Sequence, residues 1–233
     1  MKLKPYLALC RVSNLPTVWT NVLAAVVLSG GGTVALFLLL LLSMSLFYTG
    51  GMCLNDLCDA EQDRIRKPFR PIPSGRISIS SAMVLTAILF ALGLAPFFFL
   101  PHGRALPAAS LLLLMIVAYD LLHKSRPSSI LLMAGCRLMV FVVSALAAAG
   151  TVNSPVVLAG LLQFTYILIL SGVARVENRK MKGFSLPVIP FMLASISAID
   201  GIVMAFFSSP LWLLAGSGGM GLAYFGQGYV RGD

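Results

Sequence analysis

The sequence predicts an all-α fold, a polytopic bundle of about eight transmembrane helices in a single domain over residues 1–233. Three observations lead to this prediction: 58% of residues are hydrophobic, only 11% are charged, and long apolar runs recur along the chain. A soluble domain of 233 residues would expose far more polar surface. Runs of about 20 apolar residues cross a hydrocarbon layer of about 30 Å. Such runs must be helical here because they lack the alternation of barrel strands.

The apolar runs follow one another along nearly the whole chain. The expected spans are residues 12–28, 34–54, 78–100, 105–122, 129–149, 155–174, 186–207 and 210–229. The last of them contains the glycine-rich segment GSGGMG, residues 216–221. Glycines would loosen an isolated helix, but they permit close packing against a neighbouring helix.

Lysine and arginine gather at alternate ends of these spans. They precede the first span (Lys2, Lys4, Arg11) and follow the second (Arg64, Arg66, Lys67, Arg70, Arg76), the fourth (Lys124, Arg126), the sixth (Arg175, Arg179, Lys180, Lys182) and the eighth (Arg231). The intervening loops hold only Arg104. Because cytoplasmic loops carry the positive charge, both termini and the charged loops are expected on the cytoplasmic face, in a bacterial inner membrane. Nucleic-acid binding is not expected, since it requires basic residues clustered on a soluble surface.

Half of the eight acidic residues lie in one stretch, NDLCDAEQDRIRKPFRPIPSG, residues 55–75. If the second helix continues past Leu54, Asp56, Asp59 and Asp63 share one face, because they are three and four residues apart. Three like charges so close repel one another unless a cation or basic side chains lie among them. Hard oxygen ligands of this kind suit Mg²⁺, which also binds substrate phosphates. The alternative is a solvated charged loop balanced by the arginines that follow.

The acidic stretch also resembles a known family. NDLCDAEQD is similar to the NDxxDxxxD signature of the UbiA superfamily of intramembrane prenyltransferases, and RPIPSG, residues 70–75, is the segment that typically follows it. Three more stretches agree in order and spacing: RVSNLPTVWTNVLAA at the first span, YDLLHK after the fourth and ARVENRKMKGFSLPV after the sixth. The resemblance covers nearly the whole chain.

This resemblance implies a helix bundle whose central cavity opens to lipid beneath cytoplasmic loops. It implies a membrane prenyltransferase that binds an isoprenyl diphosphate through Mg²⁺, ionises its allylic carbon–oxygen bond and transfers the chain to a small acceptor, often an aromatic ring. Metal ions and basic groups lower the barrier because the leaving diphosphate gains negative charge. Carried over by position, the catalytic and metal-binding residues are Asp56, Asp59 and Asp63, with Asn55 assisting. Arg70 and the catalytic Lys124 would contact the diphosphate.

The sequence departs from the family at the second acidic motif, usually DxxxD. Arg175 and Arg179 replace both aspartates, and Glu177 is the acid that remains. A second Mg²⁺ bound by the usual pair is therefore not expected. Two interpretations stay open. The two guanidinium groups would grip the diphosphate directly, or the metal chemistry has been lost and the bundle is a non-catalytic lipid-binding or export component.

A second departure lies after the fourth span. The family pattern YxxxK, which begins at Tyr119, would place lysine at position 123, where this chain has His123, with Lys124 next. His123 would take over a diphosphate-binding or proton-handling role, or it is an interfacial polar residue.

Polar residues inside the expected spans are candidates for the substrate cavity, because they are unfavourable in lipid. Arg137 lies about 12 Å below the cytoplasmic end of its span at 1.5 Å per residue. It would form the wall below the diphosphate, pair with an acceptor's carboxylate, or form a structural pair. Asp200 lies deeper, about 21 Å by the same measure, so a direct ion pair with Arg137 is not expected. Asn14, Asn21 and Tyr119 would line the cavity, although interhelical hydrogen bonds explain the two asparagines equally well.

Overall fold

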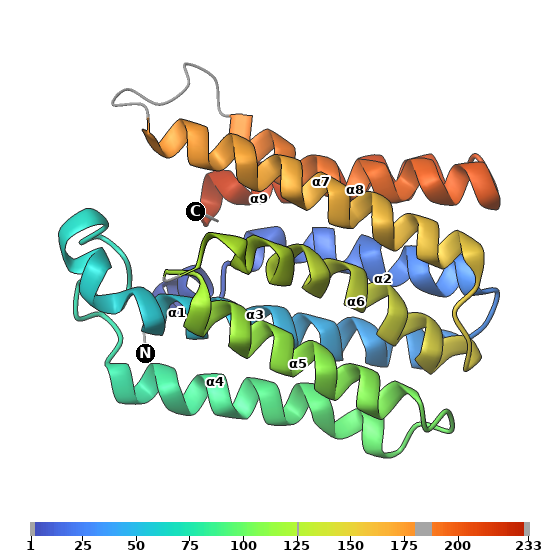
Figure 1. Ribbon diagram of the computed structural model, residues 1–233, viewed down its shortest axis with the longest axis horizontal. Coiled ribbons are helices and arrows are strands. Elements are labelled where there is room, and N and C mark those ends of the chain that lie inside the picture. The colour runs from blue at the N-terminus through green and yellow to red at the C-terminus, as the bar shows by residue number, and fades with distance from the viewer. Residues whose placement is uncertain (1–2, 125, 180–187, 231–233) are drawn as a thin grey trace.

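The helices of the protein lie side by side along the long axis of the molecule in the computed structural model, which describes residues 3–124, 126–179 and 188–230 (Figure 1). The long helices are α2 (Leu15–Ser29), α3 (Val34–Arg66), α4 (Ile79–Leu94), α5 (Ala105–Leu122), α6 (Ile130–Ala149), α7 (Ser154–Arg179), α8 (Val188–Phe207) and α9 (Trp212–Tyr229). The short elements are α1 (Leu3–Leu9), η1 (Val12–Asn14), η2 (Ala95–Phe98) and η3 (Pro127–Ser129). The described residues contain no strand, and the predicted all-α fold is confirmed.

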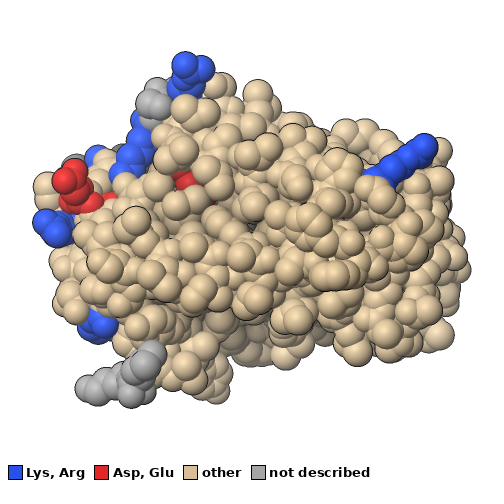
Figure 2. Space-filling model, turned by 90° about the horizontal axis from the view of Figure 1, so that it is seen from below, with Lys and Arg blue, Asp and Glu red and all other residues tan. Residues whose placement is uncertain are grey.

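Most of these helices are suited to a lipid environment. Within the described residues, seven of them, α2 to α8, are long and apolar enough to cross a membrane. The eighth expected span corresponds to the glycine-rich helix α9. Figure 2 shows that charged side chains gather at one end of the visible face, and that a wide uncharged band separates them from an isolated basic group at the other end. The protein is therefore an integral membrane protein.

Helix α9 packs closely along α8 because glycines face each other at their crossing. A Cβ atom on Gly201 of α8 would lie 2.7 Å from the Cα atom of Gly216, and a Cβ atom on Gly216 would lie 2.6 Å from the Cα atom of Gly201. Further along α9, a Cβ atom on Gly219 would meet the Thr20 methyl group at 2.7 Å. The glycine-rich segment thus allows the close contact that the sequence suggested.

Helix α3 carries the acidic residues out of the membrane. It has 33 residues, or about 50 Å at 1.5 Å per residue, which exceeds the hydrocarbon thickness of about 30 Å. The helix continues well past Leu54, as the shared acidic face requires, and ends just before Pro68. The chain then folds back, and Ile72 and Ile77 are buried against Leu9 and neighbouring apolar residues. This small core holds residues 70–75 beside the end of α3.

Candidate active site

Two acidic residues of α3 are joined by an arginine from the loop that follows. Arg70 Nη1 donates to Asp56 Oδ1 at 3.2 Å and to Asp63 Oδ2 at 2.5 Å. All three side chains are buried, with residue exposures of 8%, 3% and 6% in that order. The loop is fixed locally because the Ser74 amide and hydroxyl both donate to the Arg70 carbonyl, at 3.0 and 2.7 Å. A basic side chain therefore separates the like charges of the acidic face.

Arg11 is a second cation on this face, and sequence reasoning treated it only as a topology signal. It lies between α1 and η1 with a left-handed backbone conformation, φ 45°. Its Nη2 atom contacts Asp56 Oδ1 at 2.9 Å and the Asn55 side-chain oxygen at 3.4 Å. Burial alone would lower the pKa of the Arg11 guanidinium, but the Asp56 carboxylate raises that pKa overall. Arg11 consequently remains charged beside Asp56.

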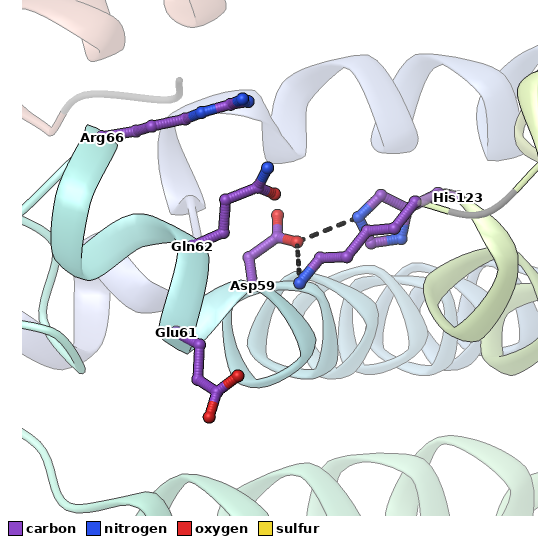
Figure 3. A pocket seen from close by; sticks show the side chains of 6 residues that line it. Asp59, Glu61, Gln62, Arg66 and His123 are labelled. Carbon is purple, nitrogen blue, oxygen red and sulfur yellow. Dashed lines mark hydrogen bonds and ion pairs between the residues drawn. The ribbon is translucent and has the colours of Figure 1, made fainter.

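The third carboxylate, Asp59, faces a different pair of basic side chains at the end of α5 (Figure 3). Its Oδ1 atom lies 3.0 Å from His123 Nε2 and 3.1 Å from Lys124 Nζ. The other ring nitrogen, His123 Nδ1, lies 2.9 Å from the Asp120 carbonyl oxygen. The ring thus bridges the end of α5 and the Asp59 carboxylate of α3. Tyr119 stacks against the same ring, with centroids 5.5 Å apart.

Each of the three carboxylates keeps one oxygen available. In the described structure, the basic partners use Asp56 Oδ1, Asp59 Oδ1 and Asp63 Oδ2, and no hydrogen bond or ion pair involves the other oxygen of each group. No three His, Cys, Asp or Glu side chains of the described residues converge on one point. The donor chemistry still fits Mg²⁺, because these are hard anionic oxygens on one helix face beside an amide, that of Asn55.

Asp120 is a site residue that sequence reasoning missed. It is 3% exposed, and its Oδ1 atom accepts a hydrogen bond from Asn55 Nδ2 at 3.1 Å. This bond leaves the Asn55 oxygen directed toward Arg11, which contacts it. An acid inside an expected span was the signal that could have identified Asp120, as it identified Asp200.

The predicted cavity residues divide into two groups. Asn21 accepts from Arg137 Nη1 at 2.7 Å and donates to Asp200 Oδ2, also at 2.7 Å. Arg137 and Asp200 form no direct ion pair within the described part of the chain, but the Asn21 amide bridges them, so they lie closer together than their expected depths suggested. Asn14 instead accepts a hydrogen bond from Gln227 of α9 at 3.1 Å. Both asparagines thus connect helices, and Asn21 also adjoins Arg137.

The residues that replace the second acidic motif lie at the end of α7. Arg175 is exposed there, while the side chain of Arg179 falls outside the described part of the structure. A direct contact of these two arginines with a diphosphate therefore stays a prediction.

Comparison with known proteins assigns the chain to a family. The UbiA prenyltransferase family matches residues 15–230. The chain belongs to this family. Among solved structures, a UbiA homolog from Archaeoglobus fulgidus bound to GPP and Mg²⁺ is 17% identical, with a TM-score of 0.63 over 97% of each chain. The structure of a digeranylgeranylglyceryl phosphate synthase is 23% identical, with a TM-score of 0.66 over 98% of this chain and 95% of that one. These likenesses show that the UbiA fold is present.

Among curated UbiA relatives, the digeranylgeranylglyceryl phosphate synthase of Sulfolobus acidocaldarius is 40% identical over 110 residues. The match covers 46% of this chain and 40% of the relative's length. The synthase of Methanocaldococcus jannaschii is 39% identical over 95 residues, or 34% of its length. The chain thus spans well under half of these curated relatives, and their activity is a basis for a proposal.

Proposed function

We propose that this protein is a Mg²⁺-dependent membrane prenyltransferase that moves an isoprenyl chain from its diphosphate to a small acceptor. The arrangement of Asp56, Asp59 and Asp63 on α3 carries the proposal. Each carboxylate has one oxygen paired with basic side chains and one oxygen that forms no ion pair with the described residues. Ligands for a cation and cationic groups for a diphosphate therefore lie together at the end of the bundle. Family membership and the A. fulgidus homolog bound to GPP and Mg²⁺ support the proposal.

In this proposal, Asp56, Asp59 and Asp63 hold Mg²⁺, assisted by Asn55. When bound, Mg²⁺ would supply neutralisation of the negative charge on the diphosphate. The basic partners of these carboxylates would also bind the diphosphate, because their N–H groups can donate to a phosphate oxygen in place of a carboxylate oxygen. Those partners are Arg11, Arg70 and Lys124, with the His123 ring beside Lys124, and the positive charge of Arg11, Arg70 and Lys124 stabilises the diphosphate as it leaves.

The remaining steps follow from the position of the site. The site lies at the charged end of the helices, so the apolar isoprenyl chain extends from it along the membrane-spanning segments. The allylic carbon–oxygen bond breaks and the bonding electrons leave with the diphosphate. The acceptor then attacks the allylic carbocation and loses the proton from the atom that forms the new bond. An aromatic acceptor follows from the resemblance, while the names of the curated relatives suggest a prenylated glyceryl phosphate.

One observation favours a second candidate function, a non-catalytic lipid-binding or export component. Arg175 and Arg179 occupy the two positions where the family pattern has aspartates, so the usual second metal-binding pair is missing. Under this alternative, a prenyl diphosphate or another anionic lipid binds to the same cationic side chains and is not cleaved.

Pyrophosphate release tests the two functions against each other. Detergent-purified protein receives geranyl, farnesyl or geranylgeranyl diphosphate, with a membrane extract as the source of acceptor, in the presence and absence of Mg²⁺. We expect release with at least one donor and its loss when a chelator removes Mg²⁺, because the uncompensated charge of the leaving diphosphate raises the barrier. Folded protein that binds these donors without releasing pyrophosphate would favour the lipid-binding function.

We also propose that the charged end of the bundle, with both chain termini, faces the cytoplasm. Most charged side chains on the face shown in Figure 2 gather at that end, in keeping with the positive-inside rule. Green fluorescent protein fused after residue 233 should therefore fluoresce in cells, because it folds in the cytoplasm. A fusion that is expressed but does not fluoresce would indicate the opposite orientation. The bacterial origin of the membrane stays a prediction, and the curated relatives named above are archaeal.

A further inference from the structure

Two free thiols meet where the end of α1 packs against α3. Cys10 Sγ lies 3.7 Å from Cys53 Sγ, although 43 positions separate the two residues in the chain. The other cysteines, Cys58 and Cys136, form no hydrogen bond with a thiol in the described structure. A disulfide bond holds its sulfur atoms about 2.0 Å apart, so Cys10 and Cys53 need to approach by about 1.7 Å to become bonded.

The surroundings of the two thiols differ in access. Cys53 is 0% exposed on α3 and belongs to the same small core as Leu9 and Ile77. The Cys10 amide donates to the Tyr6 carbonyl at 2.9 Å, so this thiol extends from the last turn of α1. Cys10 is partly exposed. A small oxidant therefore reaches Cys10 first, and the enclosed Cys53 thiol lies beside the sulfur that has reacted.

The residue next to Cys10 connects the thiol pair to the proposed reaction site. Arg11 follows directly, and its Nη2 atom lies 2.9 Å from Asp56 Oδ1. Asp56 comes three positions after Cys53, so both lie on the same face of α3. The turn after α1 thus contacts α3 twice, through a thiol and through an ion pair. Because the Arg11 backbone already has an unfavourable left-handed conformation, φ 45°, it has little freedom to absorb a displacement of Cys10.

We propose that Cys10 and Cys53 form a reversible oxidation site, at which a peroxide joins them by a disulfide bond and thereby slows the reaction at Asp56. The effect on the reaction rests on the proposed function, whereas the modification does not. Drawing Cys10 toward α3 displaces Arg11, so its guanidinium group loses the present contact with Asp56. In the reducing cytoplasm, at the end of the bundle where the pair lies in the proposed orientation, both thiols are free until a peroxide is present.

The oxidation consumes one molecule of hydrogen peroxide in two steps. The Cys10 thiolate attacks a peroxide oxygen and the O–O bond breaks, which leaves a sulfenic acid; the departing hydroxide takes up the proton that Cys10 released. The Cys53 sulfur then attacks the Cys10 sulfur and the S–O bond breaks, and this hydroxide takes the Cys53 proton. Two thiols thus give two electrons and two protons to the peroxide, which becomes two waters. A dithiol reverses the change by thiol–disulfide exchange.

Disulfide formation is measured on detergent-purified protein without any variant. The protein is treated with hydrogen peroxide, the remaining thiols are blocked with N-ethylmaleimide, and proteolytic peptides are analysed by mass spectrometry. We expect a linked pair of peptides that contain Cys10 and Cys53, and loss of the linkage after dithiothreitol. Cys58 and Cys136 should carry the blocking group. Absence of the Cys10–Cys53 linkage would overturn the proposal.

The effect on the reaction is measured as pyrophosphate release after oxidation relative to release by the same protein before oxidation. We expect a decrease of about tenfold, as for the loss of a hydrogen bond to a charged group, and recovery with dithiothreitol. Recovery distinguishes the disulfide from methionine sulfoxide, which dithiothreitol leaves oxidised. Cys10→Ser and Cys53→Ala should each abolish the sensitivity, because neither can form the bond. Cys58→Ser is the matched control, since it removes a thiol from α3 and keeps the pair; it should remain sensitive.

Two results of this second experiment would also contradict the proposal. One is an undiminished rate in protein whose Cys10–Cys53 linkage has been verified. The other is equal sensitivity in Cys58→Ser and in whichever of Cys10→Ser and Cys53→Ala folds. Because the linked peptides are detected without turnover, the oxidation site can be observed even if pyrophosphate release fails, so failures of the two proposals are distinguishable.

Discussion

Replacing Asp59 with asparagine is expected to reduce Mg²⁺-dependent pyrophosphate release by about 100-fold to 1,000-fold. The side chain keeps its size but loses the negative charge that pairs with His123 and Lys124 at 3.0 and 3.1 Å. It also loses an anionic oxygen that would bind the cation. Initial rates at saturating donor, measured across a Mg²⁺ titration, provide the comparison. The Mg²⁺ concentration for half-maximal rate should rise as well.

Glu61→Gln is the matched control for this experiment. Glu61 is an exposed acid on the same helix, two positions from Asp59. It borders the same cavity, but Figure 3 shows its carboxylate turned away from Asp59 and His123. Its loss of charge changes the net charge of the protein by the same amount. We expect the Glu61→Gln rate to remain within about twofold of the unmodified protein, because Glu61 is exposed and forms no described ion pair with the basic side chains of the site. Full activity in Asp59→Asn would show that the Asp59 carboxylate is not needed for pyrophosphate release.

Replacing Arg70 with leucine is expected to destabilise the protein by about 3–5 kcal/mol, the cost of breaking a buried ion pair from one side. Arg70 bonds both Asp56 and Asp63, and all three residues are less than 9% exposed. The substitution leaves two buried carboxylates close together, with Arg11 as the remaining partner of one of them. Denaturant unfolding of purified protein in micelles, followed by circular dichroism, measures the change.

Arg66→Leu separates this effect from a general loss of positive charge. Arg66 is exposed at the end of α3 and takes part in no described hydrogen bond or ion pair. Its replacement should change stability by less than about 0.5 kcal/mol. Equal destabilisation by the two substitutions would show that the buried ion pairs of Arg70 add nothing to the free energy of unfolding beyond the effect of its charge.

Sequence reasoning succeeded where the determining signal is local. The helical fold follows from apolar runs long enough to cross a membrane, because lipid leaves the backbone no other way to satisfy its polar groups. The common face of Asp56, Asp59 and Asp63 follows from spacings of three and four residues once α3 extends through Arg66. Rise per residue was a poorer guide to Arg137 and Asp200, because both bond the Asn21 amide at 2.7 Å although different depths were expected for them.

The contacts that give the site its charge balance were decided by tertiary structure. Arg11 meets Asp56 across 45 positions of the chain, Asn55 meets Asp120 across 65, and Arg137 meets Asn21 across 116. Such partners depend on how several helices pack and rotate against one another, which no spacing within one helix specifies. The sequence by itself determined the membrane helices and the acidic face. Only the packed bundle decided which cation pairs with each carboxylate, because side chains on separate helices meet only after those helices have docked.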